Sequence, residues 1–121
     1  MAFDNSYIDA NWFRGKTAAP GYNSRLHVIV LSPEDMPVAV AHGWADEATG
    51  TAEIDPVATH PQHRRRRLAQ AAILEAFRRL TGRGIRVAWI ASGPEPNPSN
   101  LLYESLTPTQ TWHFRRWAKQ L

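Results

Sequence analysis

The residue pattern changes abruptly at His60-Pro61, and this change constrains the fold more than any other feature of the chain. The residues just before it, Thr51–Thr59, fit a β-strand. After it, apolar residues recur at the three- and four-residue spacings of an α-helix. These residues are Leu68, Ala72, Ile73, Ala76, Phe77 and Leu80. The chain therefore passes from a strand into an amphipathic helix through a short connection, and that connection carries four consecutive arginines.

Two further strands are expected before this point, and another after the helix. Short turns separate the early strands, which is typical of an antiparallel meander. Gly82 and Gly84 end the helix, and Ile85–Ala91 then fits a strand parallel to the one before the helix. The three strands of the meander are expected at Leu26–Leu31, Val38–Ala45 and Thr51–Thr59.

Shorter sequence patterns predict the structure of the two ends of the chain. Residues 1–24 contain an aromatic and apolar group that suggests a short amphipathic helical segment, ended by Pro20-Gly21. That group is Tyr7, Ile8, Trp12 and Phe13. Asn97-Pro98 is typical of a helix start, with Asn97 as the cap and the helix running to Leu106. Thr111–Ala118 alternates aromatic and basic residues and is expected to form a last strand. The predicted fold is α/β (α+β), with a mixed sheet: an antiparallel meander followed by a parallel strand-helix-strand unit.

Composition limits the class of protein. A chain of 121 residues with 43% apolar content favours one domain over residues 1–121 with one core. Without cysteine it has no disulfide and no thiolate site. No apolar stretch is long enough to span a membrane, and no secretory signal is evident, so we expect a soluble cytoplasmic protein. His60 and His63 lack a third ligand at metal spacing, so no metal site is expected.

The net charge is only +3, but the arginines are concentrated in the middle of the chain. The first N–H groups of a helix favour phosphate, and arginine side chains add directional donors. A strand, a basic turn and a helix start therefore suit a pyrophosphate. A nucleic-acid backbone is the alternative anion, but the aromatic residues are not interleaved with these arginines as single-strand binders require.

This segment resembles the coenzyme-binding signature of the GNAT family of N-acetyltransferases, Arg/Gln-x-x-Gly-x-Gly/Ala at the start of a long helix. Arg67 stands where the family usually has glycine. A second stretch, N-P-S-N-L-L-Y-E-S-L from Asn97 to Leu106, resembles the family's later motif. The resemblance covers Pro20 to Trp117, with residues 25–118 as the GNAT-like core and 1–24 as a shortened N-terminal segment. The residues that match the first motif are Arg64, Arg65, Arg66, Arg67, Leu68 and Ala69.

The resemblance implies transfer of acetyl from acetyl-CoA, without a metal, to a primary amine of a small molecule or peptide. Glu53 or Asp55, on one face of a strand, would take the proton of the amine. A strand N–H near Val57 or Ala58 would meet the oxyanion, and Tyr103 would protonate the departing thiolate. The residues that would hold the coenzyme are Val57, Ala58, Thr59, Arg64, Arg65, Arg66, Arg67, Leu68, Ala69, Asn97 and Asn100.

Other interpretations stay open from sequence. Glu53 and Asp55 also fit plain exposed strand carboxylates, and Tyr103 fits a helix anchor. The chain also fits a non-catalytic relative that binds coenzyme A or a protein. A homodimer would complete the acceptor site, and the tryptophans suit an apolar interface. The residues read most simply as core or interface are His42, Trp44, Trp89, Trp112 and Trp117.

Overall fold

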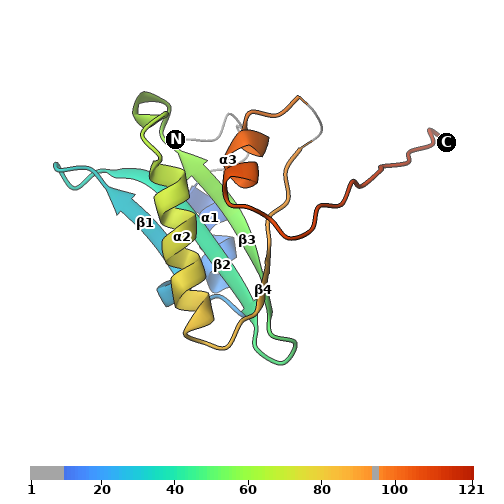
Figure 1. Ribbon diagram of the computed structural model, residues 1–121, viewed down its shortest axis with the longest axis horizontal. Coiled ribbons are helices and arrows are strands. Elements are labelled where there is room, and N and C mark those ends of the chain that lie inside the picture. Colours follow the sequence, from blue (N-terminus) through green and yellow to red (C-terminus); the bar gives the residue numbers. More distant parts are fainter. Residues whose placement is uncertain (1–9, 94–95) are drawn as a thin grey trace. The chain divides into compact units, whose positions relative to one another are not determined.

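The computed structural model describes residues 10–93 and 96–121 (Figure 1). The chain divides into two compact units, Met1–Ala91 and Ser92–Leu121. The expectation of a single domain over residues 1–121 stays a prediction. Of the predicted N-terminal group, Tyr7 and Ile8 lie outside the described residues, whereas Trp12 and Phe13 belong to helix α1. None of the helices in the described residues has the length and apolar character needed to cross a membrane.

The first unit contains a four-stranded sheet with the strand order β1-β2-β3-β4. The first three strands are antiparallel, and β4 is parallel to β3, so the predicted mixed sheet is confirmed. The strand expected at Ile85–Ala91 is shorter than predicted. The elements are α1 (Ala10–Ala18), a 3₁₀ turn (Ser24–Leu26), β1 (His27–Leu31), β2 (Pro37–Asp46), β3 (Thr51–Thr59), a 3₁₀ turn (Pro61–His63), α2 (Leu68–Thr81) and β4 (Val87–Trp89).

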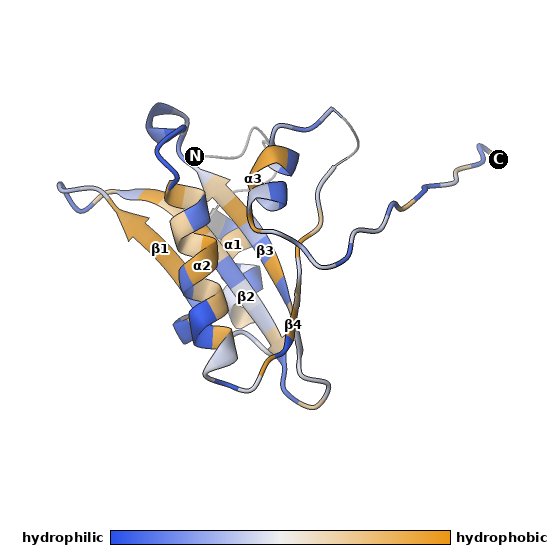
Figure 2. Cartoon of the chain, in the orientation of Figure 1, coloured by the Kyte–Doolittle hydropathy of each residue, from blue (hydrophilic) through white to orange (hydrophobic). Residues whose placement is uncertain are grey.

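Helix α2 packs on one face of this sheet, and α1 lies behind β2 in Figure 1. Small residues of β2 let α2 approach: a Cβ on Gly43 would lie 3.5 Å from Leu80 Cδ1 and 3.6 Å from Ile54 Cδ1. The predicted helical stripe is buried at Ala72, Ile73, Ala76 and Leu80, and Figure 2 shows hydrophobic and hydrophilic residues interleaved along α2. The main core residues are Leu26, Val28, Ala41, Ile54, Ala72, Ile73, Ala76 and Leu80.

Strand β3 carries one extra residue relative to β2. Ala41 pairs with Val57 and Gly43 pairs with Ile54, so two steps along β2 face three steps along β3. This is a β-bulge, which bends the strand and redirects its side chains. It lies at Asp55-Pro56, where the peptide bond is cis.

The second unit contains helix α3 (Ser99–Ser105) followed by an extended segment. The helix starts slightly later than predicted. The N-cap residue is Pro98, so the cap predicted at Asn97 is wrong by one residue. Asn97 lies just before it, and its Oδ1 accepts a hydrogen bond of 2.9 Å from the N–H of Ser99. The predicted strand at Thr111–Ala118 is wrong: these residues form no regular structure and are exposed. A strand needs a neighbouring strand and a buried face, and α3 is the only helix or strand among the described residues of this unit.

Candidate functional site

The edge of β3 that faces β4 is open along its second half. Thr51–Glu53 pair with Val87–Trp89 of β4, and within the described part of the chain this ladder goes no further. Backbone groups beyond Glu53 on this edge therefore have no strand partner among the described residues. An open strand edge of this kind binds extended molecules that carry amide groups.

The direction of the backbone groups on this edge follows from the ladder with β2. The N–H of His60 donates to the carbonyl of Val38 at 2.8 Å. Antiparallel pairs alternate between hydrogen-bonded and non-hydrogen-bonded, so Ala58, two residues earlier, also directs its N–H toward β2. Val57 and Thr59 consequently turn their N–H and C=O groups to the open edge. Of the two predicted oxyanion donors, Val57 thus has the accessible N–H.

The bulge just before this edge is held from the α1 side of the sheet. Trp44 Nε1 donates a hydrogen bond of 2.8 Å to the carbonyl of Asp55. Lys16 of α1 places its Nζ 3.6 Å from Asp55 Oδ2 and 5.3 Å from the centre of the Trp44 ring. An indole, an ammonium and a carboxylate therefore meet at the residue that begins the bulge.

The two predicted carboxylates lie on this same side of the sheet. Glu53 pairs with Trp44 in the β2–β3 register, and Asp55 reaches Lys16. Both residues are exposed. Asp55 is engaged in the ion pair, whereas no ion pair or hydrogen bond of the Glu53 side chain occurs within residues 10–93 and 96–121. Of the two carboxylates, Glu53 is therefore the one without a partner among the described residues.

Histidine and aromatic rings pack beside Trp44. The rings of His27 and His42 stack at 4.7 Å, and His42 lies 4.4 Å from Trp44. The Tyr22 hydroxyl is 3.1 Å from His27 Nδ1, and the Tyr22 ring meets His42 edge-on at 5.0 Å. His42 is 2% exposed, and its Nε2 has no hydrogen-bond partner among the described atoms.

Burial controls the charge of these two histidines. Desolvation, with smaller contributions from the charges of His27 and Lys16, lowers the pKa of His42 to about 4. Desolvation also lowers the pKa of His27. Both rings are therefore neutral at pH 7. The cluster presents aromatic surface, not positive charge, to the Lys16 ammonium.

The basic turn before α2 has an unusual backbone. Arg65 and Arg67 both have positive φ, 63° and 58°. Arg67 has ψ 26°, the left-handed conformation that glycine adopts most easily, and its side chain makes no capping hydrogen bond to α2. The chain thus adopts the glycine-type turn with arginine in place of glycine. The first N–H groups of α2 lack a capping bond from this side chain and suit an anion.

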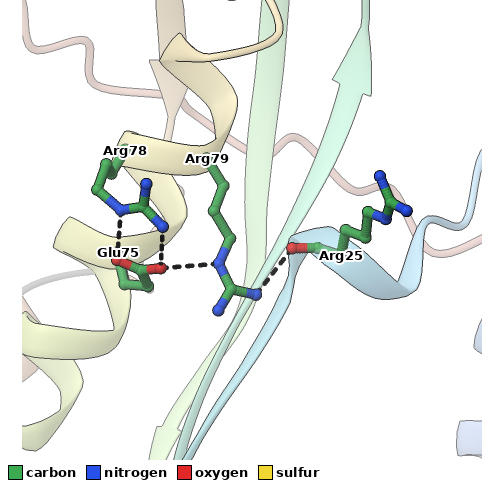
Figure 3. A network of polar contacts seen from close by, with 4 residues as sticks. All are labelled: Arg25, Glu75, Arg78 and Arg79. Atoms are coloured by element: carbon green, nitrogen blue, oxygen red, sulfur yellow. Dashed lines mark hydrogen bonds and ion pairs between the residues drawn. The ribbon is translucent and has the colours of Figure 1, made fainter.

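The arginines at the two ends of α2 differ in what they contact. At the C-terminal end, Arg78 Nε and Arg79 Nε donate to the Glu75 carboxylate at 2.8 and 2.9 Å, and Arg79 also reaches the carbonyl of Arg25 (Figure 3). The hydrogen bonds from Arg78 and Arg79 lower the pKa of Glu75 to about 2. Arg64–Arg67 are exposed, and the described residues provide no partner for their side chains. Only the N-terminal group is therefore available to an external phosphate.

A family model described as the acetyltransferase (GNAT) family matches residues 4–107. The chain belongs to this family. The match includes the open edge of β3, the basic turn and α3. It confirms the resemblance expected from the two sequence motifs. The comparison with curated proteins gave no match.

Solved structures share the fold of this GNAT chain at low sequence identity. AAC(6')-Iy, in complex with a bisubstrate analogue of coenzyme A and acetylneamine, is 18% identical, with 99% of this chain and 85% of that chain covered and a TM-score of 0.70. An aminoglycoside acetyltransferase from an uncultured soil metagenomic sample, in complex with sisomicin, is 15% identical, with 98% and 78% covered and a TM-score of 0.73. The ribosomal-protein-S18-alanine N-acetyltransferase from Escherichia coli is 18% identical, with 84% and 62% covered and a TM-score of 0.67.

The predicted residues of the second unit are arranged around the start of α3. The N–H of Asn100 donates to the carbonyl of Asn97 at 3.0 Å. Asn100 Oδ1 accepts a hydrogen bond of 2.6 Å from Ser92, and a Cβ on Gly93 would lie 2.9 Å from Asn97 Nδ2. Tyr103 is half-buried on α3. In this GNAT chain the two asparagines therefore order the loop that leads into α3, and their contact with a coenzyme stays a prediction.

Sequence reasoning missed the contribution of Lys16 and the role of Trp44. The first depends on α1 packing against the sheet, and the second on the register of β2 against β3, and no local pattern reveals either. One signal was present: His42 and Trp44 are two residues apart in a predicted strand, so they had to share a face. The structure confirms His42 as a buried residue and adds that Trp44 holds the bulge.

Proposed function

We propose that this protein transfers the acetyl group of acetyl-CoA to a primary amine by direct attack of the amine on the thioester. The observation that carries the proposal is the continuity of the open edge at Val57–Thr59 with the basic turn and the start of α2. A coenzyme with amide groups in its arm and a pyrophosphate beyond them needs these two features in this order.

The residues present fit such a coenzyme. The outward N–H and C=O groups of Val57 and Thr59 complement amide groups, with Ala58 between them. The exposed side chains of Arg64–Arg67 and the first N–H groups of α2, at Leu68 and Ala69, complement phosphate oxygens. Asn97 and Asn100 are the proposed contacts from the second unit. Acetyl-CoA supplies an activated acetyl group, and the chain supplies the binding groups and the movement of protons.

Glu53 is the proposed general base. An alkylamine is protonated at neutral pH, so a base or a water chain must take its proton before the nitrogen can attack. Glu53 is exposed and has no ion-pair partner in the described residues, whereas Asp55 is engaged with Lys16. The Val57 N–H is the proposed donor to the developing oxyanion. Tyr103 is the proposed donor of a proton to the departing thiolate.

Steady-state kinetics of a Glu53→Gln variant test this assignment. We expect kcat/KM for thiol release with a panel of primary amines to fall about 100-fold or more, while the affinity for acetyl-CoA is unchanged. Glu47→Gln, an exposed carboxylate in the turn between β2 and β3, is the matched control and should retain full activity. Equal activity of the two variants would remove Glu53 from the mechanism.

A coenzyme-binding relative without transfer activity is the second candidate, favoured by the arginine at the tight turn. Arg67 keeps a side chain where the family's glycine leaves the backbone open to the pyrophosphate. Saturable coenzyme A binding without thiol release across the amine panel would support this candidate. Strongly salt-dependent duplex binding with no coenzyme affinity would instead support nucleic-acid binding.

A homodimer is a further part of the proposal. Large apolar side chains are exposed in the second unit, among them Phe114 at 90% and Trp117 at 85%. Contact between copies would bury such surface. Size-exclusion chromatography with light scattering should give twice the chain mass of 13.6 kDa, and a monomer at all concentrations would contradict this part.

A further inference from the structure

A primary amine of the chain itself lies beside Trp44 and Asp55. Lys16 Nζ is 5.3 Å from the centre of the Trp44 ring and 3.6 Å from Asp55 Oδ2. Asp55 begins the bulge that precedes Val57, the proposed oxyanion donor. Glu53, the proposed base, is opposite Trp44 in the sheet. The internal ammonium is thus next to the residues to which we assign the chemistry.

The indole of Trp44 and the carboxylate of Asp55 are the kinds of group that bind an alkylammonium ion. The face of an indole attracts a cation through the ring quadrupole, and a carboxylate forms a charge-assisted hydrogen bond with it. The indole is fixed in place, because Trp44 Nε1 donates to the Asp55 carbonyl while His42 packs at 4.4 Å from the ring. The ring and the backbone of Asp55, which carries the carboxylate, are therefore held by contacts that do not involve Lys16.

The surroundings of the site favour a single cation. His27 and His42, the titratable groups of the adjoining cluster, are neutral at pH 7 because burial lowers their pKa values. Glu53 and Asp55 contribute negative charge from β3. Lys16 is 34% exposed and Asp55 56% exposed at their side chains, so water and solutes reach the pair. Ion pairs of this exposure are weak enough for an external ammonium to displace.

We propose that the Trp44 ring and the Asp55 carboxylate form the subsite for the primary alkylammonium group of the acceptor, and that Lys16 fills this subsite until the acceptor displaces it. The acceptor class is then an aliphatic amine on an unbranched carbon, like the lysine side chain that occupies the site. This inference rests on the proposed acetyl transfer for its purpose, but the binding itself requires no coenzyme.

Binding of n-butylammonium chloride to the full chain tests the subsite without any coenzyme. The readout is the Trp44 indole N–H in a ¹H–¹⁵N NMR spectrum, assigned among the five tryptophans by its loss in Trp44→Phe. We expect a saturable shift of this signal. n-Butanol at the same concentrations, which lacks the charge, should leave the signal in place.

Three variants locate the site. Lys16→Met removes the internal competitor and should tighten the Kd of n-butylammonium about two- to fivefold. Asp55→Asn removes the carboxylate and should abolish the saturable shift. Lys119→Met, the only other lysine of the chain, is the matched control and should leave the Kd unchanged. The remaining amide signals report that each variant is folded.

Two results would overturn the subsite. One is an indole signal of Trp44 that does not respond to n-butylammonium in the wild-type chain or in Lys16→Met. The other is an equal response of wild type and Asp55→Asn. If n-butylammonium binds as expected but no amine is acetylated, the subsite stands and the proposed transfer activity fails. If acetyl transfer occurs but the indole signal is silent, the acceptor uses another subsite.

Discussion

The left-handed conformation of Arg67 predicts how one substitution, Arg67→Gly, changes the stability of the folded protein. Arg67 has φ 58° and ψ 26° at the residue before α2. For a residue with a Cβ, this conformation costs about 1–2 kcal/mol, whereas glycine adopts it at no steric cost. Substitution by glycine should therefore release this strain from the folded state.

Glycine also lowers stability by adding freedom to the unfolded chain, by about 0.5–1 kcal/mol. Arg64→Gly measures that effect separately, because Arg64 has an ordinary extended backbone with φ −67° and ψ 162°. Both arginines are exposed, and both variants lose one positive charge. The unfolded-state and charge effects therefore cancel in the comparison. Arg67→Gly should exceed Arg64→Gly in unfolding free energy by about 1–2 kcal/mol.

Urea denaturation followed by circular dichroism measures this difference. With a urea m-value of about 1–2 kcal/mol/M for a chain of this size, the two midpoints should differ by about 1 M. Arg65→Gly repeats the test independently, since Arg65 has φ 63°. Equal midpoints for Arg64→Gly and Arg67→Gly, or a lower midpoint for Arg67→Gly, would refute the strained turn.

Three further predictions concern the sheet and its two faces. Folding lowers the pKa of His42 to about 4, so between pH 6.5 and 4 the unfolded chain binds a proton at His42 that the folded chain does not. The free energy of unfolding should therefore fall on acidification across this window, by up to about 3 kcal/mol. In urea titrations at several pH values, His42→Phe should remove most of this pH dependence. Ile73→Ala should cost about 2–5 kcal/mol in thermal unfolding, because Ile73 is fully buried, and a loss below about 1 kcal/mol would contradict the packing. Trp44→Phe should cost about 0.5–1.5 kcal/mol through the lost bond to Asp55, and unchanged stability would argue against that bond.

The elements that the sequence predicted correctly are those whose buried residues recur at a regular spacing along the chain. The spacing of Ile73, Ala76 and Leu80 marks the buried face of α2, because each turn of helix returns a residue to the same side. The meander and the parallel β4 followed from turn lengths and from the helix that precedes β4. The family of the chain was likewise recognisable, since the motif before α2 is contiguous in the chain.

The features that sequence did not reveal depend on pairing between distant segments. The bulge at Asp55 is set by the register of β3 against β2, and Lys16 reaches it only because α1 crosses the back of the sheet. The left-handed backbone of Arg67 is imposed by the turn against the preference of arginine. The alternation at Thr111–Ala118 predicted a strand, but alternation cannot form one where no neighbouring strand supplies hydrogen bonds.

The most direct test of the coenzyme site is a titration of the ¹⁵N-labelled chain with desulfo-coenzyme A, followed by its amide signals. We expect saturable binding, with the largest shifts at the open edge of β3, Val57 and Thr59, and at the start of α2, Leu68 and Ala69. The interior of β1, which lies two strands away from that edge, should be little affected. Absence of binding, or shifts that spare Val57 and Thr59, would contradict the assignment of a coenzyme site to this edge.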